Sequence, residues 1–156
     1  KKLNINFVDI DEEIEKELGK SIKEIFEHEG EDYFRKIEEK ITLKKLKLRS
    51  VIISLGGGAF INQNIRKEVI KNHISFWLDW NHHTLLNRIK KSKKRPLAIN
   101  LNTYEINKLI KDRSKKYKQA NYIINCDKLG KIQIVEKILK YYEKYRNKDK
   151  YQNKKI

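Results

Sequence analysis

The sequence predicts an α/β fold built on a parallel sheet with helices on both faces. Four short apolar runs alternate with segments of helical periodicity, an alternation typical of parallel sheets. One run, at 51–55, is rich in β-branched residues and leads directly into three glycines at 56–58. Glycines at the carboxyl end of a buried strand let the backbone turn tightly and approach a ligand closely. An α/β enzyme is therefore the leading interpretation.

The elements before residue 73 follow from capping residues and apolar spacing. Asp11 is expected to cap the first helix, Gly19 to break it, and Ser21 with Glu24 to form a capping box for the second helix. A kink is expected near Gly30 in that second helix. The predicted order is a strand at 4–9, a helix at 11–18, a helix from 21 to before 51, a strand at 51–55 and a helix at 62–72.

The remaining elements continue the same alternation. They are a strand at 74–78, a helix at 81–90, a helix at 103–118, a strand at 122–126 and a helix at 131–145. Residues 91–103 interrupt the pattern with a Lys- and Arg-rich run and the only proline, which predicts a mobile basic loop. The polar, Lys-rich residues 147–156 are expected to form a frayed tail.

The composition limits the class of protein. The 156 residues suit one domain, which we expect to span 1–146. The formal net charge of +16 suits anionic ligands or nucleic acid, but lysines are spread along the whole chain, which favours a compositional bias over a nucleic-acid surface. Cys126, the only cysteine, is expected to be a buried thiol in a reducing compartment. Without a membrane span or signal peptide in the sequence, we expect a cytoplasmic protein.

Two carboxylates end the first predicted strand. Asp9 and Asp11 alternate there, so they are expected to share a face and to converge on one site. Such a pair suits hydroxyl binding, proton abstraction or a magnesium shell. The alternative is that Asp11 only caps the helix and that Asp9 is a solvated turn residue.

Three arginines are candidates for binding anions. Arg35 has Glu38 one helical turn ahead, which can orient it toward a carboxylate or can simply form an intrahelical ion pair. Arg113 is a candidate for a second carboxylate contact, or a solvated helix residue. Arg95, in the basic loop, is a candidate for closing on a transferred phosphate, or an exposed charge.

Taken in order, these segments closely resemble shikimate kinase. The resemblance covers about residues 1–146. It rests on Asp-x-Asp, Gly-Lys-Ser-Ile-x-Glu-Ile-Phe, Gly-Glu-x-x-Phe-Arg-x-x-Glu, Ser-Leu-Gly-Gly-Gly-Ala, Arg-Pro-Leu and Arg-x-x-x-Tyr. It implies the P-loop kinase fold with strand order 2-3-1-4-5, and transfer of the ATP γ-phosphate to the 3-hydroxyl of shikimate with Mg²⁺. This reaction belongs to chorismate and aromatic amino acid biosynthesis.

The resemblance also implies a role for each matching residue. Asp11 would bind substrate hydroxyls and orient or deprotonate the attacking one, and Asp9 would support magnesium through water. Arg35 and Arg113 would hold the shikimate carboxylate, with Glu38 positioning Arg35. The remaining roles are a backbone contact to a hydroxyl (Gly57, Gly58), the pocket wall (Phe26, Phe34), the lid arginine (Arg95, in a lid at about 91–103) and the adenine and phosphate side (Arg88).

The phosphate-binding loop of the family is missing from the sequence. The only Gly-Lys-Ser, at 19–21, follows a predicted helix rather than a strand, and Ile14 stands where the motif needs its first glycine. We therefore expect a chain truncated at its amino end that lacks the central strand of the sheet. Such a chain is expected to bind ATP poorly and, because two strand edges are unpaired, to fold poorly or aggregate.

Three other interpretations stay open. A non-catalytic relative that binds a ligand or protein is one, although it has no physical need for Asp11, Arg35 and Arg113 together. A related small-molecule kinase, such as a gluconate kinase, is the second. A basic RNA-binding module is the third and most distant interpretation. Such a module should gather its lysines with aromatic residues, and this chain does so only at 137–155. We expect a monomer with shikimate and ATP as partners, and neither a membrane nor a specific nucleic acid.

Overall fold

The computed structural model describes residues 5–91 and 101–152, and its strands are all parallel. Strand β1 (Asn6–Asp9) pairs with β2 (Val51–Ser54), and β3 (Phe76–Asp79) pairs with β4 (Tyr122–Asn125). Helices separate successive strands along the chain, as the sequence predicts. The α/β class with a parallel arrangement is therefore confirmed.

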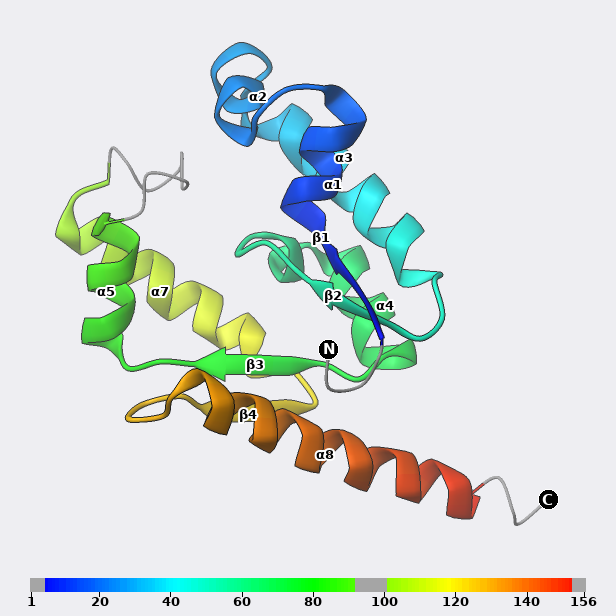
Figure 1. The fold of residues 1–156 in the computed structure, drawn as a ribbon. Helices are drawn as coiled ribbons and strands as arrows, with labels where there is room; N and C mark the ends of the chain where they lie inside the picture. Colours follow the sequence, from blue (N-terminus) through cyan, green and yellow to red (C-terminus); the bar gives the residue numbers. More distant parts are fainter. Residues whose placement is uncertain (1–4, 92–100, 153–156) are drawn as a thin grey trace.

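The helices and the short 3-10 turn η1 complete the element order. They are α1 (Ile10–Leu18), α2 (Ile22–His28), α3 (Gly30–Leu46), η1 (Ala59–Ile61), α4 (Gln63–Asn72), α5 (His82–Lys91), α7 (Thr103–Tyr117) and α8 (Lys131–Gln152). We call the part from β1 to α4 the first half and the part from β3 to α8 the second half. Figure 1 shows each half with its own strand pair.

The two strand pairs are separate sheets in the described part of the chain. No hydrogen-bonded ladder joins β2 to β3 there. In the expected order 2-3-1-4-5, β1 and β2 correspond to the strands numbered 2 and 3, and β3 and β4 to those numbered 4 and 5. Within the described residues, no strand stands between β2 and β3.

The first half has its core between the strand pair and helices α1 to α3. Five buried side chains form this core: Ile10, Ile14, Ile25, Phe34 and Ile41. Val8 and Ile53 pack against it from the strands, whereas their neighbours Phe7 and Ile52 are exposed. Since adjacent strand residues point to opposite faces, helices cover one face of this pair and leave the other face open.

Two helix boundaries in the first half differ from those predicted. Asp9, not Asp11, caps α1: its extended backbone places the carboxylate where Oδ1 accepts from the N–H groups of Asp11 (3.0 Å) and Glu12 (3.4 Å). The predicted helix from 21 is in fact two helices, because Gly30 at φ 82° turns the backbone between α2 and α3. The capping box of Ser21 and Glu24 is confirmed.

The second half packs helices on both faces of β3 and β4. Ile124, Cys126 and Ile134 form a buried cluster under α8, and Trp77 contacts Tyr117 of α7 on the other face. Cys126 is buried and has no disulfide partner, as predicted, and burial raises the pKa of its thiol.

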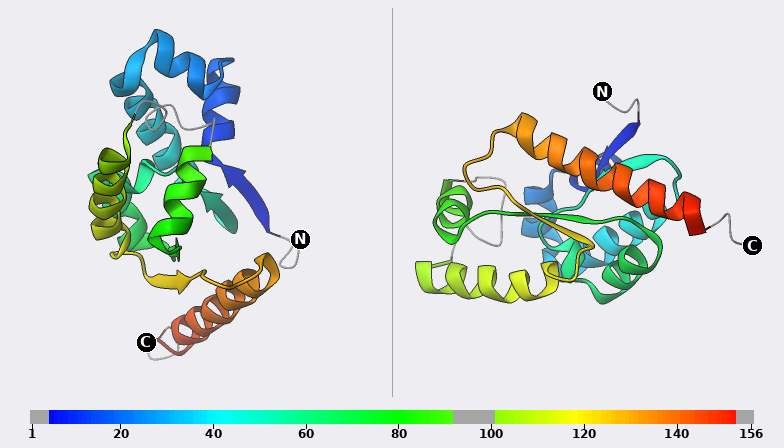
Figure 2. Two further views of the ribbon diagram at one scale, coloured as in Figure 1. Left: turned by 90° about the vertical axis from the view of Figure 1, so that its left-hand side faces the viewer. Right: turned by 90° about the horizontal axis from the view of Figure 1, so that it is seen from below.

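Helix α8 runs to Gln152, so the predicted frayed tail is wrong for that stretch; residues 153–156 lie outside the described part. The two views in Figure 2 show α8 lying along β4 on the side away from α7. None of the helices in the described ranges is both long and apolar enough to cross a membrane.

Candidate active site

A cavity of about 470 Å³ lies between the two halves, beside the three glycines that follow β2. Its walls come from α1, α2, α3, β3, α5 and α7 as well as the glycine segment. It gathers most of the residues singled out from the sequence: Asp11, Phe26, Phe34, Arg35, Glu38, Gly57, Gly58 and Arg113. Residues more than 100 positions apart in the chain thus meet in one place.

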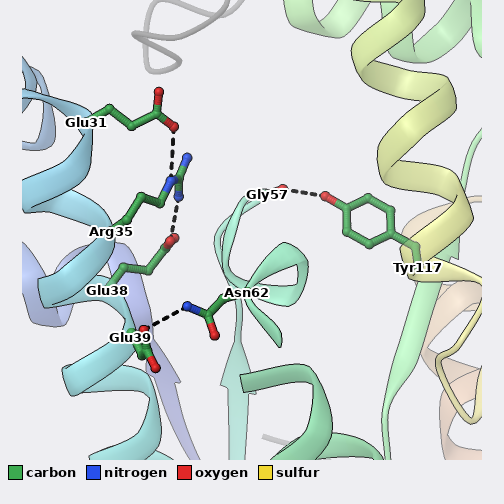
Figure 3. A network of polar contacts seen from close by, with 7 residues as sticks. All are labelled: Glu31, Arg35, Glu38, Glu39, Gly57, Asn62 and Tyr117. Carbon is green, nitrogen blue, oxygen red and sulfur yellow. Dashed lines mark hydrogen bonds and ion pairs between the residues drawn. The ribbon is translucent and has the colours of Figure 1, made fainter. Parts of the chain in front are cut away.

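Arg35 is held on α3 by two carboxylates. Its Nη1 donates to Glu38 Oε2 at 2.5 Å and its Nε donates to Glu31 Oε1 at 3.2 Å, as Figure 3 shows. Its guanidinium also lies 5.0 Å from the centroid of the Phe34 ring. These contacts fix the plane of the guanidinium at the cavity wall, the arrangement needed for bidentate binding of a carboxylate.

Glu38 is a buried carboxylate, with 2% of its surface exposed. Burial raises its pKa and outweighs the neighbouring Arg35, which lowers it. A buried charge needs a partner, so removal of Arg35 would leave Glu38 uncompensated. The pair therefore behaves as one unit that is built into the site.

The pKa of Asp11 is also raised. Burial is the main cause, followed by the charges of Asp9 and Glu15, while Arg35 acts in the opposite direction. Its carboxylate points at the glycine segment, where a Cβ added to Gly56 would lie 2.7 Å from Asp11 Oδ1. Asp11 is thus placed to accept a hydrogen bond from a ligand hydroxyl in the cavity.

Each of the three glycines lies against a charged side chain. A Cβ on Gly56 would meet Asp11 and Glu38, a Cβ on Gly57 would lie 3.4 Å from Arg113 Nη1, and a Cβ on Gly58 would lie 2.6 Å from Arg35 Cζ. Any side chain at 56 or 58 would displace one of these groups. Close approach, rather than a left-handed backbone, is therefore the reason for glycine here.

Polar contacts hold the turn that follows the glycines. Asn62 Nδ2 donates to Glu39 Oε2 at 2.8 Å, joining the turn to α3 (Figure 3). Arg66 Nη1 donates to the carbonyls of Phe60 (3.2 Å) and Ile61 (2.8 Å). On the opposite side, the hydroxyl of Tyr117 donates to the carbonyl of Gly57. The glycine segment is thus fixed from both halves.

Apolar side chains close the rest of the cavity. Phe26 and Phe34, which were predicted to form the pocket wall, line the cavity with ring centroids 4.7 Å apart. Sequence reasoning gave no role to Trp77 or Tyr117, which also line the cavity. Tyr117 belongs to the Arg-x-x-x-Tyr segment, and its spacing of one helical turn from Arg113 was the available signal. Trp77 carries no such signal.

Two predicted residues in the described part of the chain, Asp9 and Arg88, do not line the cavity. Asp9 caps α1 with Oδ1, as described above. The guanidinium of Arg88, on α5, stacks 3.7 Å from the centroid of the Trp80 ring. Arg95, with residues 92–100 of the predicted lid, lies outside the described residues. In the described ranges, no three His, Cys, Asp or Glu side chains are grouped closely enough to hold a metal ion.

The cavity combines complementary chemistry for a small anion that carries hydroxyl groups. Arg35 and Arg113 supply cations, Asp11 supplies an acceptor, and the glycine segment brings backbone close to the ligand space. Phe26, Phe34 and Trp77 supply the apolar walls that shield such contacts from water. The arrangement is one for binding and orientation.

Comparisons with known proteins agree on one family. The sequence profile of the family described as shikimate kinase matches residues 1–143. The shikimate kinase of Bartonella henselae is 38% identical over 95% of this chain and 71% of its own length. The shikimate kinase of Sulfurihydrogenibium sp. is 41% identical over 88% of this chain and 82% of its own length.

Solved structures give the same result. Shikimate kinase from Aquifex aeolicus superposes with a TM-score of 0.81 at 35% identity, over 91% of this chain and 83% of that one. Shikimate kinase from Acinetobacter baumannii in complex with shikimate superposes with a TM-score of 0.83 at 29% identity, over 92% of this chain and 81% of that one.

The fold and the relatives place the chain among small-molecule kinases with the P-loop kinase fold. More narrowly, the chain belongs to the shikimate kinase family.

Proposed function

We propose that the cavity binds shikimate and presents one of its hydroxyls for phosphoryl transfer from ATP. The observation that carries this proposal is the meeting of Arg35, Arg113 and Asp11 around the glycine segment in one cavity. Shikimate is a small triol carboxylate, so its two kinds of polar group match the two kinds of contact that the cavity offers. The relative from Acinetobacter baumannii, which is 29% identical, is described in complex with shikimate.

Arg35 and Arg113 hold the carboxylate of shikimate. Arg35 is held in place by Glu38 and Glu31, so it loses little conformational freedom when the ligand arrives. Arg113 approaches the same cavity from α7 beside Gly57. Two guanidinium groups on opposite walls fix both the position and the orientation of the ring that carries the carboxylate.

Asp11 accepts a hydrogen bond from the attacking hydroxyl and orients it. Its raised pKa makes it a stronger base than an ordinary aspartate, which suits proton transfer from the hydroxyl as the new bond to phosphorus forms. Phosphoryl transfer needs little covalent assistance, so orientation and charge neutralisation are the tasks left to these side chains.

We assign the phosphate side of the reaction to Arg88, Arg95 and Asp9. Arg88 and Arg95 would face the nucleotide, and Asp9 would hold Mg²⁺ through water with the carboxylate oxygen that the helix cap leaves over. Bound Mg²⁺ would neutralise phosphate charge. Since the sequence contains no Gly-x-x-x-x-Gly-Lys-Ser/Thr segment, we expect residues 1–156 alone to bind ATP weakly.

We place the kinase domain at 1–146, with a lid at about 91–103, and expect a cytoplasmic monomer. Sedimentation of the purified chain would test the monomer, and limited proteolysis in the presence and absence of ligands would test the lid.

Calorimetry tests the proposed function directly. We expect shikimate to bind the chain, and Arg113→Lys to weaken binding by about tenfold or more because lysine cannot form the bidentate pair. Arg146→Lys, which alters a cation over Tyr142 on α8, is the matched control and should leave the affinity unchanged. A wild-type chain that is folded and binds no shikimate would overturn the proposal.

A coupled assay of ADP release separates binding from catalysis. Turnover of shikimate with ATP would support the kinase assignment for residues 1–156 themselves. Shikimate binding without turnover would instead favour a ligand-binding role for this chain.

A further inference from the structure

The hydroxyl of Tyr117 connects the second half of the molecule to the glycine segment of the first. It donates to the carbonyl of Gly57, as Figure 3 shows, across 60 positions of sequence. The Tyr117 ring is itself held between aromatic neighbours, with centroids 6.3 Å from Phe60 and 5.8 Å from Trp77. The direction of the hydroxyl is therefore set by packing on more than one side.

This hydrogen bond also orients the N–H of Gly58. A trans peptide is planar, and its C=O and N–H point in opposite directions. With the Gly57 carbonyl directed at the Tyr117 hydroxyl, the N–H of Gly58 points away from that hydroxyl. Within the described residues, this N–H has no intramolecular acceptor, so it remains available to a ligand.

Tyr117 and Arg113 belong to the same face of α7. They are four residues apart, one turn of helix, and both lie against Gly57: Arg113 Nη1 at 3.4 Å from the position of an added Cβ, and Tyr117 at the carbonyl. One rigid helical turn thus carries a guanidinium for the ligand carboxylate and a hydroxyl that fixes the neighbouring peptide.

We propose that Tyr117 is a positioning residue that turns the N–H of Gly58 toward one hydroxyl of the bound ligand. Through the shared turn of α7, it also fixes the separation between that N–H and the guanidinium of Arg113. The site then selects for ligands whose carboxylate and hydroxyl stand at the matching separation. This inference rests on the proposed binding of shikimate and adds a specificity determinant that touches the peptide rather than the ligand.

The test compares Tyr117→Phe with the wild type by calorimetry against shikimate and its three monodeoxy analogues. We expect the variant to bind shikimate about tenfold more weakly, the size of one lost hydrogen bond in a ligand site. For the analogue that lacks the hydroxyl facing Gly58, the two proteins should differ by less than about twofold, because the contact is already missing. Tyr122→Phe removes a hydroxyl from β4, away from the cavity, and should change none of the affinities.

The pattern across analogues separates positioning from loss of structure. Equal weakening for shikimate and all three analogues, or no weakening at all, would overturn the role of Tyr117 while leaving shikimate binding intact. A wild-type chain without shikimate affinity would remove the proposed function and this inference together. Amide hydrogen exchange gives a second readout: shikimate should protect the Gly58 N–H in the wild type and in Tyr122→Phe but much less in Tyr117→Phe.

Discussion

At the residue scale, the geometry of the site depends on the three glycines having no side chain. Each glycine has a charged side chain in or beside the space that its own side chain would occupy: Asp11 and Glu38 at Gly56, Arg113 at Gly57, and Arg35 at Gly58. The segment can pass between these groups because glycine has no Cβ. The same close packing raises the pKa values of Asp11 and Glu38. The burial of charged side chains around the glycine backbone therefore explains both why glycine is needed there and why the two pKa values are raised.

Gly58→Ala should abolish the arginine contact without unfolding the protein. The new methyl group would lie 2.6 Å from Arg35 Cζ, so the guanidinium must move away from the cavity. We expect shikimate affinity to fall by about tenfold or more, the scale of a lost charge-assisted hydrogen bond. Gly130→Ala is the matched control, because its methyl group would meet only Gln133 Oε1 at 3.6 Å. Unchanged affinity in Gly58→Ala would show that Arg35 does not hold the ligand.

Shikimate binding should weaken on acidification at a higher pH than an ordinary aspartate would cause. The pKa of Asp11 is raised above its usual 3.8, so the acceptor is protonated earlier as the pH falls. A titration of affinity against pH should therefore show a loss in the wild type that is missing in Asp11→Asn. The Asn variant also corrects for the carboxyl group of the ligand itself, which titrates in the ordinary acid range.

The same group affects stability with the opposite sign. Because the folded state holds the Asp11 proton more tightly than the unfolded state, the free energy of unfolding should fall as the pH rises from 3.8 through the raised pKa. Asp11→Asn removes the Asp11 contribution to this dependence, leaves that of Glu38, and should be more stable than the wild type at neutral pH. Chemical denaturation at several pH values measures both effects.

At the element scale, helix ends and turns decide where the site residues stand. Asp9 ends β1 and caps α1, which places Asp11 in the first helical turn, where it lines the cavity. Ser21 and Glu24 fix the start of α2, which carries Phe26. Gly30 then allows α3 to begin in a new direction and to present Arg35 and Glu38 on one face, because they are three residues apart.

Asp9 can be tested for two roles with two substitutions. Asp9→Asn keeps a good helix cap and removes the charge, so stability should change little while Mg²⁺-dependent nucleotide binding weakens. Asp9→Ala also removes the cap and should lower the free energy of unfolding by about 1 kcal/mol. Thermal melts and nucleotide titrations with and without Mg²⁺ measure the two roles. If both variants bind nucleotide as the wild type does, Asp9 is a helix cap alone.

Most elements could be predicted from the sequence because their signals are local. Apolar runs placed the four strands within about two residues, and the Ser21 capping box marked the start of α2. The cap of α1 was assigned wrongly, since Asp9 and Asp11 are both good capping residues and only the end of the β1–β2 ladder at Asp9 and Ser54 decides between them. Turn η1 was not predicted, because the hydrogen bonds that hold it involve side chains outside the turn. Glu39 accepts from Asn62, which follows the turn, and Arg66 donates to the carbonyl of Phe60.

The candidate site could be predicted where a motif marks it and not where only packing does. Arg35, Glu38 and the glycines stand in recognisable segments, and the structure brings them together. Tyr117 was part of a motif without a role, because its partner Gly57 lies 60 positions away and no spacing rule connects the two. Trp77 is one apolar residue in a strand, and nothing in its sequence surroundings marks it as a cavity residue.

At the scale of the whole molecule, the site lies between two loosely joined halves. Each half has its own two-stranded sheet and its own core, and no strand of the described residues bridges them. The most extensive contact between elements of the two halves is that of α7 with η1. Tyr117 and the hydrogen bond from Arg66 Nε to Gln119 Oε1, at 3.1 Å, reinforce it. Two-stranded sheets have little stability alone, so the edges of β2 and β3 remain a predicted site of aggregation.

This division predicts two unfolding transitions in the absence of ligand. Both tryptophans, Trp77 and Trp80, belong to the second half, so their fluorescence reports that half, whereas circular dichroism reports the helices of both. If the halves are weakly coupled, the two probes should give midpoints that differ.

Shikimate would contact Asp11 and Arg35 in one half and Arg113 in the other, and it binds only when both are folded. Saturating shikimate should therefore raise the midpoints and bring them together, since the ligand stabilises the joined state by mass action. In Arg113→Lys the same concentration should leave the midpoints further apart. Coincident transitions without ligand would instead mean that α7 and η1 already couple the halves into one cooperative unit.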